Sequence, residues 1–174
     1  MTDLVRESFL LAQEREGREL AAASDIVSIE PLGSSPHERY LVRFDARSVL
    51  ADGDGPREAN GVFAVGVWFP SDYHRQVAMP QVLTWLGPRE FFHPNVHGPF
   101  ICLGTFRPGT PLVEIVFRVW SVVSYQNYGL KSPLNPNAAA WARRHLDRFP
   151  VDSRPLKRRV RNFNTQVFER GGAA

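Results

Sequence analysis

Four short strand-like runs, separated by turn residues, occupy the chain between residues 25 and 86. The second run alternates, with Tyr40, Val42 and Phe44 on one face, and the third is almost continuously apolar until Pro70 stops it. Strands at such short spacing, joined by turns, predict an antiparallel meander rather than a parallel sheet. The runs are residues 25–30, 39–45, 61–69 and 81–86, with a turn cluster at 51–56 and Pro80 opening the fourth.

Helical patterns lie on either side of these strands. Residues 2–16 predict an amphipathic helix capped by Thr2, and Gly17 either ends it or lets it continue to Ala23. A second helix is predicted after Thr110 as the cap and Pro111 as the first helical residue. Its apolar residues recur at helical spacing and form a broad stripe for the core: Leu112, Ile115, Val116, Val119, Trp120 and Val123.

Two more helices are predicted near the C-terminus. Asn135–Pro136 repeats the cap-and-proline signal for a helix to about Arg148, and a last, basic helix is predicted from Ser153 or Pro155 to Phe168. Residues 88–110 form a long irregular loop that is too rich in aromatic and aliphatic side chains to be disordered. We predict one α+β domain over residues 1–174, with an N-terminal helix, a four-stranded antiparallel meander sheet, this loop and C-terminal helices.

Composition excludes several classes of protein. The 174 residues are 43% hydrophobic and 22% charged, which is typical of a globular chain, and the net charge of +3 hardly argues for nucleic acid. One cysteine allows no internal disulfide, and the five histidines show no metal-ligand spacing, so no metal or cofactor is expected. No apolar run could span a bilayer and no signal peptide is recognisable, so we expect a cytoplasmic protein without a membrane partner.

The only cysteine, Cys102, lies in the long loop, nine residues after His93. Alone, it is more typical of a small buried hydrophobic residue than of a nucleophile, and His93 alone is more typical of a structural histidine than of a base. The flanking segments change this interpretation. The loop contains His93-Pro94-Asn95 and Ile101-Cys102-Leu103, and Ser132-Pro133-Leu134-Asn135-Pro136 follows the next helix.

With these motifs the chain resembles the ubiquitin-conjugating enzyme family, from roughly Leu32 to Leu146. The run 61–73 resembles that family's third strand with its Phe-Pro-x-Asp-Tyr exit, and Met79-Pro80-Gln81-Val82 resembles the start of its fourth strand. His93-Pro94-Asn95 matches its His-Pro-Asn motif, and Ile101-Cys102-Leu103 matches its active-site tripeptide. Residues 108–115 resemble the loop that enters the family's second helix, and 132–136 its Pro-Leu-x-Pro turn. These six pieces in register are specific, although each alone is weak.

The resemblance implies a role for four residues. Cys102 would carry the C-terminus of a ubiquitin-like protein as a thioester, and an amine would then attack that thioester. Asn95 would either donate to the oxyanion or brace the loop, and sequence does not choose between them. His93 would lock the turn, and Ser132 would orient the incoming lysine. The implied partners are a ubiquitin-like modifier, an activating-type enzyme and a target protein amine.

The chain also departs from the family. The interval from Asn95 to Cys102 is one residue shorter than usual, Lys131 and Gly129 replace acidic residues of the gate, and residues 74–78 lack the proline-rich pattern that partner ligases recognise. We therefore expect a bacterial relative, and such relatives are associated with antiviral operons.

Three other functions are weighed against conjugation. The chain could be a non-catalytic module that binds a ubiquitin-like protein or a partner enzyme, as the shortened loop suggests. It could be a cysteine hydrolase that uses Cys102 with His93 or His97, which requires a ring nitrogen within hydrogen-bonding reach of the sulfur. Nucleic-acid binding by the basic C-terminal segment, about residues 153–174, is a minority interpretation, because a charge run is usually a solvated face.

Overall fold

The computed structural model describes residues 3–158, and its order of elements is that of an α+β fold. It begins with α1 (Leu4–Ala22), whose cap is Asp3 rather than the predicted Thr2, because the Asp3 carboxylate accepts a hydrogen bond from the Arg6 backbone N–H. The helix continues through Gly17, and a Cβ built there would lie 3.1 Å from Leu112 Cδ2. The bare glycine thus lets α1 lie close to the helix that begins at Leu112.

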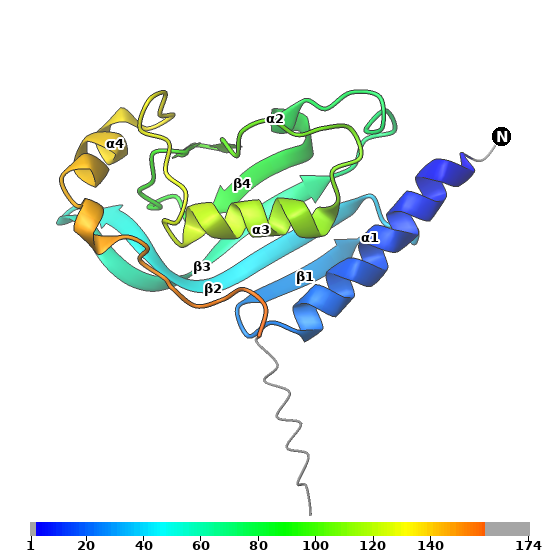
Figure 1. Ribbon diagram of the computed structural model, residues 1–174, viewed down its shortest axis with the longest axis horizontal. Helices are drawn as coiled ribbons and strands as arrows, with labels where there is room; N and C mark the ends of the chain where they lie inside the picture. Colours follow the sequence, from blue (N-terminus) through cyan, green and yellow to red (C-terminus); the bar gives the residue numbers. More distant parts are fainter. Residues whose placement is uncertain (1–2, 159–174) are drawn as a thin grey trace, which may run out of the picture.

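The sheet is an antiparallel meander in the order β1-β2-β3-β4, as the sequence predicts (Figure 1). Its strands are β1 (Val27–Leu32), β2 (Arg39–Asp52), β3 (Gly55–Trp68) and β4 (Leu83–Gly87). The central hairpin is much longer than predicted, since β2 runs seven residues past the expected end at Asp45 and pairs throughout with β3. The turn between these strands is only Gly53 and Asp54, shorter than the turn predicted at residues 51–56. Gly55, the first residue of β3, has a φ of +98°, which a glycine adopts without strain.

The segment from Met79 to the end of the sheet also differs from expectation. Residues 79–82 form a single helical turn, α2 (Met79–Val82), with Pro80 in its first positions, so β4 begins two residues later than predicted. Past β4 the long loop holds only two short strands, β5 (Val96–His97) and β6 (Phe100–Ile101). It is otherwise irregular, as predicted.

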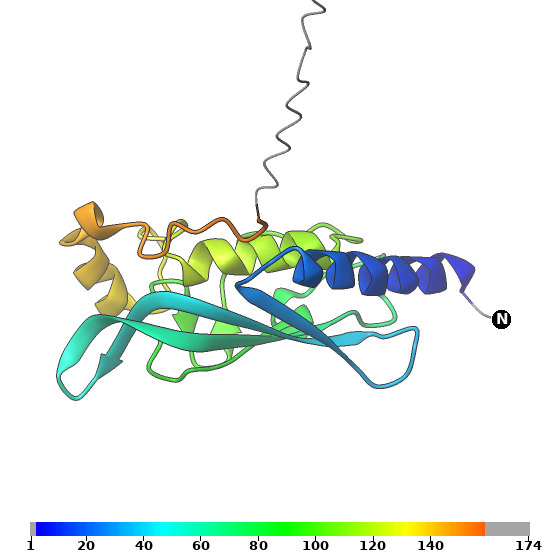
Figure 2. The ribbon, with the colours of Figure 1, turned by 90° about the horizontal axis from the view of Figure 1, so that it is seen from below.

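One helix lies over the centre of the sheet, α3 (Leu112–Val123). Figure 2 shows α1 and α3 together on one face of the sheet. Every residue of the predicted stripe is buried, and Trp120 stacks on Phe44 of β2 at a centroid distance of 6.1 Å. The predicted cap was wrong: Pro111 holds the cap position, while the Thr110 hydroxyl closes a turn by donating to the Arg107 carbonyl.

The C-terminal part is less helical than predicted. Asn135 caps α4 (Pro136–Arg143) as expected, but the helix ends at Arg143, and a 3₁₀ turn (Leu146–Arg148) replaces its last residues. Residues 153–158 are not helical, so the predicted basic helix is wrong there, and the rest of it lies outside the described residues.

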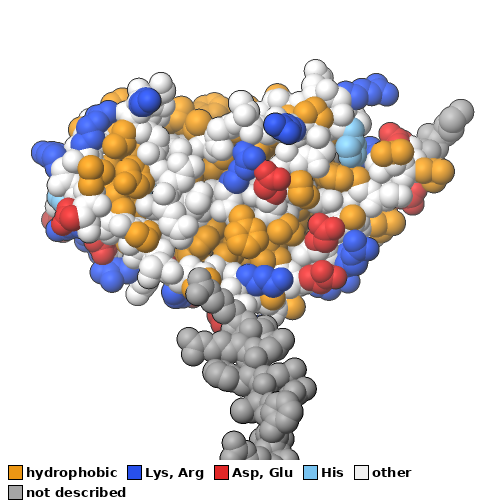
Figure 3. Space-filling model, in the orientation of Figure 1, with side chains coloured by type: hydrophobic (Ala, Val, Ile, Leu, Met, Phe, Trp, Pro, Cys, Tyr) orange, Lys and Arg blue, Asp and Glu red, His pale blue; other side chains and the backbone are white. Residues whose placement is uncertain are grey.

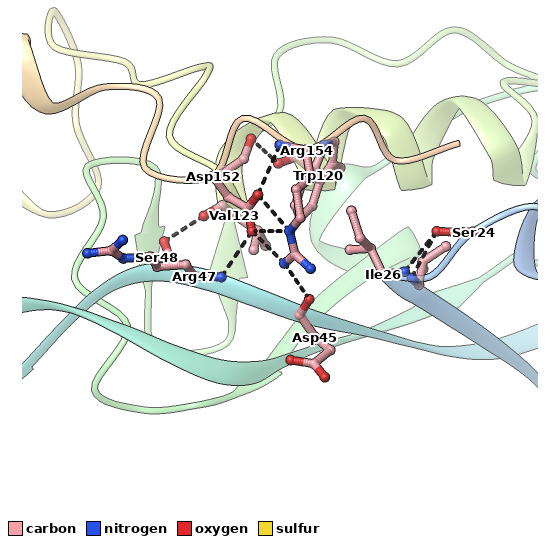
Figure 4. A network of polar contacts seen from close by, with 11 residues as sticks. Ser24, Ile26, Asp45, Arg47, Ser48, Trp120, Val123, Asp152 and Arg154 are labelled. Atoms are coloured by element: carbon pink, nitrogen blue, oxygen red, sulfur yellow. Dashed lines mark hydrogen bonds and ion pairs between the residues drawn. The ribbon is translucent and has the colours of Figure 1, made fainter. Parts of the chain in front are cut away.

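The segment 151–158 is tied to the sheet by the buried carboxylate of Asp152 (Figure 4). This carboxylate accepts hydrogen bonds from the Arg47 backbone N–H and from the Arg154 guanidinium, which also donates to the Asp45 carbonyl. Burial raises the pKa of Asp152, but the hydrogen bonds from Arg154 and Arg47 outweigh it and hold the pKa below the usual value. The charged Asp152 side chain thus holds residues 151–158 against the sheet in a non-helical conformation, where a helix was expected. Among residues 3–158, no helix combines the length and apolar character needed to cross a bilayer.

Candidate active site

Cys102 stands at the end of the β5–β6 hairpin, whose turn contains Gly98 at a φ of +57°. β6 ends at Ile101, and the alternation of exposed and buried residues that is typical of a strand continues to Leu103. Ile101 and Leu103 are each 5% exposed and join the core, whereas Cys102 between them is exposed. Two buried neighbours therefore anchor the segment and present the thiol to solvent.

The side chain of Asn95 joins two segments that meet beside Cys102. Its Nδ2 donates to the Cys102 carbonyl at 2.8 Å, and its Oδ1 accepts from the Gly129 backbone N–H at 2.6 Å. The Cys102 N–H in turn donates to the Asn95 carbonyl at 2.8 Å. Asn95 is only 7% exposed. In this arrangement its amide braces the loop, which is one of the two roles that the sequence left open.

His93 supports Asn95 from beneath. Its ring is fully buried between Phe91 and Tyr125, and its Nδ1 accepts a hydrogen bond from the Asn95 backbone N–H at 3.0 Å. Burial lowers the pKa of His93 to about 3, although the nearby Asn127 backbone opposes this. The ring is therefore neutral with its proton on Nε2, which faces the interior without a hydrogen bond of ordinary geometry. This is the geometry of a structural histidine.

Ser132 is exposed on the segment that links α3 to α4, residues 124–135, which we call the gate segment. Three hydrogen bonds hold it against the cysteine loop and α4: Gly129 to Asn95, the Asn135 N–H to the Pro94 carbonyl, and the Arg143 guanidinium to the Leu130 carbonyl. The gate segment and the Cys102 loop are thus two sides of one site, although 34 residues separate Asn95 from Gly129.

The structural roles of two residues of this site could not be predicted from the sequence. Gly129 is named there only as a replacement for an acidic gate residue, yet its backbone N–H donates a hydrogen bond to the Asn95 amide oxygen. Tyr125 has a φ of +60°, which is rare for a residue with a side chain, and its hydroxyl donates to the Phe92 carbonyl. Its ring stacks on Phe149 at 4.5 Å. No signal in the sequence marks a tyrosine for this conformation, whereas a glycine after a helix is at least a common pattern.

The site contains no arrangement for metal or hydrolase chemistry in the part of the chain that the structure describes. Residues 3–158 hold no cluster of three potential metal ligands. No hydrogen bond joins the Cys102 sulfur to a histidine ring nitrogen within that range, and the Nδ1 of His93 is engaged by Asn95. The geometry that a cysteine hydrolase requires is therefore missing for His93 and His97 alike.

No family model and no curated protein matches this sequence. Among solved structures, the chain is similar to the E2 domain of a ubiquitin conjugating enzyme from Toxoplasma gondii. The TM-score is 0.56 over 82% of this chain and 89% of that one, at 15% sequence identity. The chain has a ubiquitin-conjugating-enzyme fold. This confirms the predicted fold class, with its N-terminal helix, four-stranded meander and C-terminal helices.

A conjugating-enzyme-like domain accounts for the place of the long loop. In this chain the sheet and α3 share one packed core, and the loop after β4 carries the exposed Cys102. At 15% identity the likeness concerns the fold alone, so the chemistry has to be argued from the residues of this site.

Proposed function

We propose that this protein is a ubiquitin-like protein conjugating enzyme, which carries a ubiquitin-like modifier as a thioester on Cys102 and transfers it to an amine. The observation that carries the proposal is an exposed thiol flanked by two buried residues, with its own carbonyl held by the Asn95 amide. A thiol fixed in this way meets a large protein substrate without reorganising the loop.

The chemistry proceeds in two acyl transfers. First, the Cys102 thiol displaces the thiol of an activating-type enzyme from the modifier's C-terminal carbonyl and forms a new thioester. Next, a target amine attacks this carbonyl, the C–S bond breaks, and an amide forms while the Cys102 thiol is regenerated. Thioester exchange conserves the acyl-transfer potential, so neither step needs a cofactor.

Three polar residues have separate roles in this proposal. Asn95 braces the two sides of the site, and the second hydrogen on its Nδ2 can donate to the oxyanion of the transfer step. His93 positions Asn95 by accepting its backbone N–H and remains neutral. Ser132, exposed on the gate segment, orients the incoming amine. The expected bacterial source, cytoplasmic location and antiviral setting stay predictions.

The decisive experiment loads the chain with ATP, an activating-type enzyme and its ubiquitin-like modifier, and resolves the products on a non-reducing gel. We expect an adduct that dithiothreitol removes, an adduct resistant to dithiothreitol with Cys102→Ser, and none with Cys102→Ala. As a matched control, Ser132→Ala should load normally but transfer more slowly. Identical bands for wild type and Cys102→Ala would refute the proposal.

A non-catalytic binding module is the alternative, and one observation favours it. The amide of Asn95 already bonds both the Gly129 N–H and the Cys102 carbonyl, as in a purely structural brace. This alternative predicts that Cys102→Ala keeps full biological activity and still binds its partner. Loss of activity with binding retained would instead support catalysis.

A further inference from the structure

Phe117 departs from the burial pattern of α3. The other large apolar side chains of this helix are buried or half-buried, whereas Phe117 is 41% exposed. Figure 3 shows apolar side chains over α3 in the centre of the view, with charged side chains around them. Because an aromatic ring has a large apolar area to bury, this outer side of α3 suits a segment that packs on it.

Two neighbouring hollows meet at Phe117. The larger, of about 560 Å³, lies between α3 and the C-terminal segment, with Pro155 in its lining. The smaller, of about 190 Å³, lies between α3 and α1, with Val113 and Leu20 in its lining. Phe117 and Lys157 line both hollows, so the two form one surface depression, which we call the α1–α3 groove.

The last described residues bring the chain to this groove (Figure 1). Lys157 lines it, and the next residue, Arg158, is anchored at the C-terminal end of α1. Its backbone N–H donates to the Ala23 carbonyl at 2.9 Å, and its guanidinium pairs with Asp25 at 3.2 Å. Residues 159–174 are therefore tethered next to the groove. A segment tethered so close to a surface meets it at an effective concentration on the order of millimolar, so modest contacts are enough to hold it.

The sequence of residues 159–174 suits an apolar groove. Its large apolar residues recur at the spacing of one helix face: Val160, Phe163, Val167 and Phe168. Polar residues, among them Asn164 and Gln166, separate them. Such a face has to pack on another apolar surface to leave water, and Phe117 offers one beside the point where the segment begins.

The charges of the groove and of the segment are complementary. Glu16 and Glu19 line the α1 side of the groove. In the described part of the chain Glu19 forms no ion pair, and Glu16 pairs only with the adjacent Arg15, at 3.6 Å. The segment that follows Arg158 begins with two more arginines, Arg159 and Arg161. Two carboxylates therefore lie where a basic segment starts, and opposite charges attract.

We propose that residues 159–174 dock in the α1–α3 groove of the same chain, with their apolar face against Phe117 and their first arginines beside the two glutamates. The contact is intramolecular, because a second copy of the chain has to compete with the high local concentration of the tethered segment. The docked segment covers Phe117, so any partner of this side of α3 has to displace it.

Trypsin cleavage of the Arg161–Asn162 bond in the native full chain measures this docking. The protease cuts only the undocked segment, so the initial rate of release of the peptide that begins at Asn162, followed by mass spectrometry, reports the undocked fraction. We expect Phe117→Ala to raise the rate about fivefold, and Val167→Ala with Phe168→Ala to raise it equally. All three substitutions together should raise it no further, because they remove the same contact. A wild-type rate in Phe117→Ala overturns the inference.

Val62→Ala is the matched control for these variants. Val62 is 57% exposed on β3, and the burial alternation of that strand places it on the sheet face opposite α3. Its loss should leave the cleavage rate unchanged. If Val62→Ala accelerates cleavage as much as Phe117→Ala does, the segment is not held by the groove and the inference fails. Unchanged urea unfolding midpoints show that the variants keep their fold.

Two further measurements test the occupant and the charges. Docking within one chain predicts a cleavage rate that stays constant over about a hundredfold range of protein concentration, whereas a rate that falls as concentration rises shows docking on a second copy and overturns the intramolecular arrangement. Glu16→Gln with Glu19→Gln should raise the rate about twofold, and Glu30→Gln on β1 should not change it. Equal rates in these two variants would refute the contribution of the glutamates.

Discussion

The core under α3 and the site around Cys102 are built by different kinds of interaction. The core is a contiguous set of apolar side chains from α1, α3 and the sheet, and it contains ring pairs such as Phe44 with Trp120. The site is assembled from single hydrogen bonds between residues distant in sequence, with Asn95 at their centre. Many apolar contacts together stabilise the core, whereas the side chain of Asn95 alone determines the geometry of the site.

This difference predicts how each region responds to substitution. Loss of a core side chain should lower the free energy of unfolding strongly and affect activity only through the folded fraction. Loss of a side chain at the site should cost less stability but more activity, since catalysis depends on the position of a few atoms. Substitutions in the two regions test this contrast.

The largest effect on stability is expected for Phe44→Ala. Phe44 is fully buried and its ring stacks on Trp120, so truncation leaves a cavity that the sheet cannot close. We expect a loss of about 4 kcal/mol in the free energy of unfolding, measured by urea denaturation. Leu11→Ala on the exposed side of α1 is the control and should change it by about 0.5 kcal/mol or less. A loss below about 1 kcal/mol for Phe44→Ala would show that the core is not the stabilising region.

Asn95→Ala should have a smaller effect on stability and a larger one on chemistry. It leaves the Gly129 N–H and the Cys102 carbonyl without their partner, so we expect a loss of about 2.5 kcal/mol in unfolding free energy. Single-turnover discharge of the thioester should fall about a hundredfold. Asn95→Asp separates the contributions of the two hydrogen bonds, because it keeps the oxygen that accepts from the Gly129 N–H but removes the N–H that donates to the Cys102 carbonyl. Wild-type discharge by Asn95→Asp would show that the donor is dispensable.

Most of the fold could be predicted from the sequence, since it depends on periodicity. The stripe of α3 and the alternation of β2 identify the core-facing residues directly. The outer half of the β2–β3 hairpin was missed because residues 55–60 carry polar side chains, proline and glycine without an apolar pattern. Over residues 153–158 the predicted helix is absent for a different reason: the hydrogen bonds of Asp152 to Arg154 and Arg47 override local propensity there.

The site could be predicted in part, and only through its motifs. The resemblance pointed to Cys102, Asn95, His93 and Ser132, and the structure places the loop and the gate segment together. The hydrogen-bond partners of these residues could not be predicted from the sequence, because a hydrogen bond from Gly129 to Asn95 leaves no periodic pattern in it. The role of Asn95 was open for the same reason: either role requires the same residue at the same position.

The smallest of these effects is a pH dependence that arises beneath the site. The pKa of His93 falls to about 3 in the folded protein, compared with about 6.5 in an unfolded chain. Below pH 6.5 the unfolded state therefore binds a proton that the folded state does not, so His93 destabilises the fold progressively as the pH falls toward 3. The expected cost at pH 5.0 relative to pH 7.5 is about 2 kcal/mol.

Urea denaturation of wild type and His93→Gln at the two pH values measures this cost. The glutamine amide oxygen can still accept the Asn95 N–H but does not titrate, so the carboxylates contribute equally to both proteins and cancel in the difference. We expect wild type to lose about 2 kcal/mol more than the variant between pH 7.5 and pH 5.0. An equal loss in both proteins would mean that His93 takes up its proton within the fold. A protonated Nδ1 could not accept the hydrogen bond from the Asn95 N–H. His93 would then not be the neutral, buried support of the loop that carries the exposed Cys102 thiol.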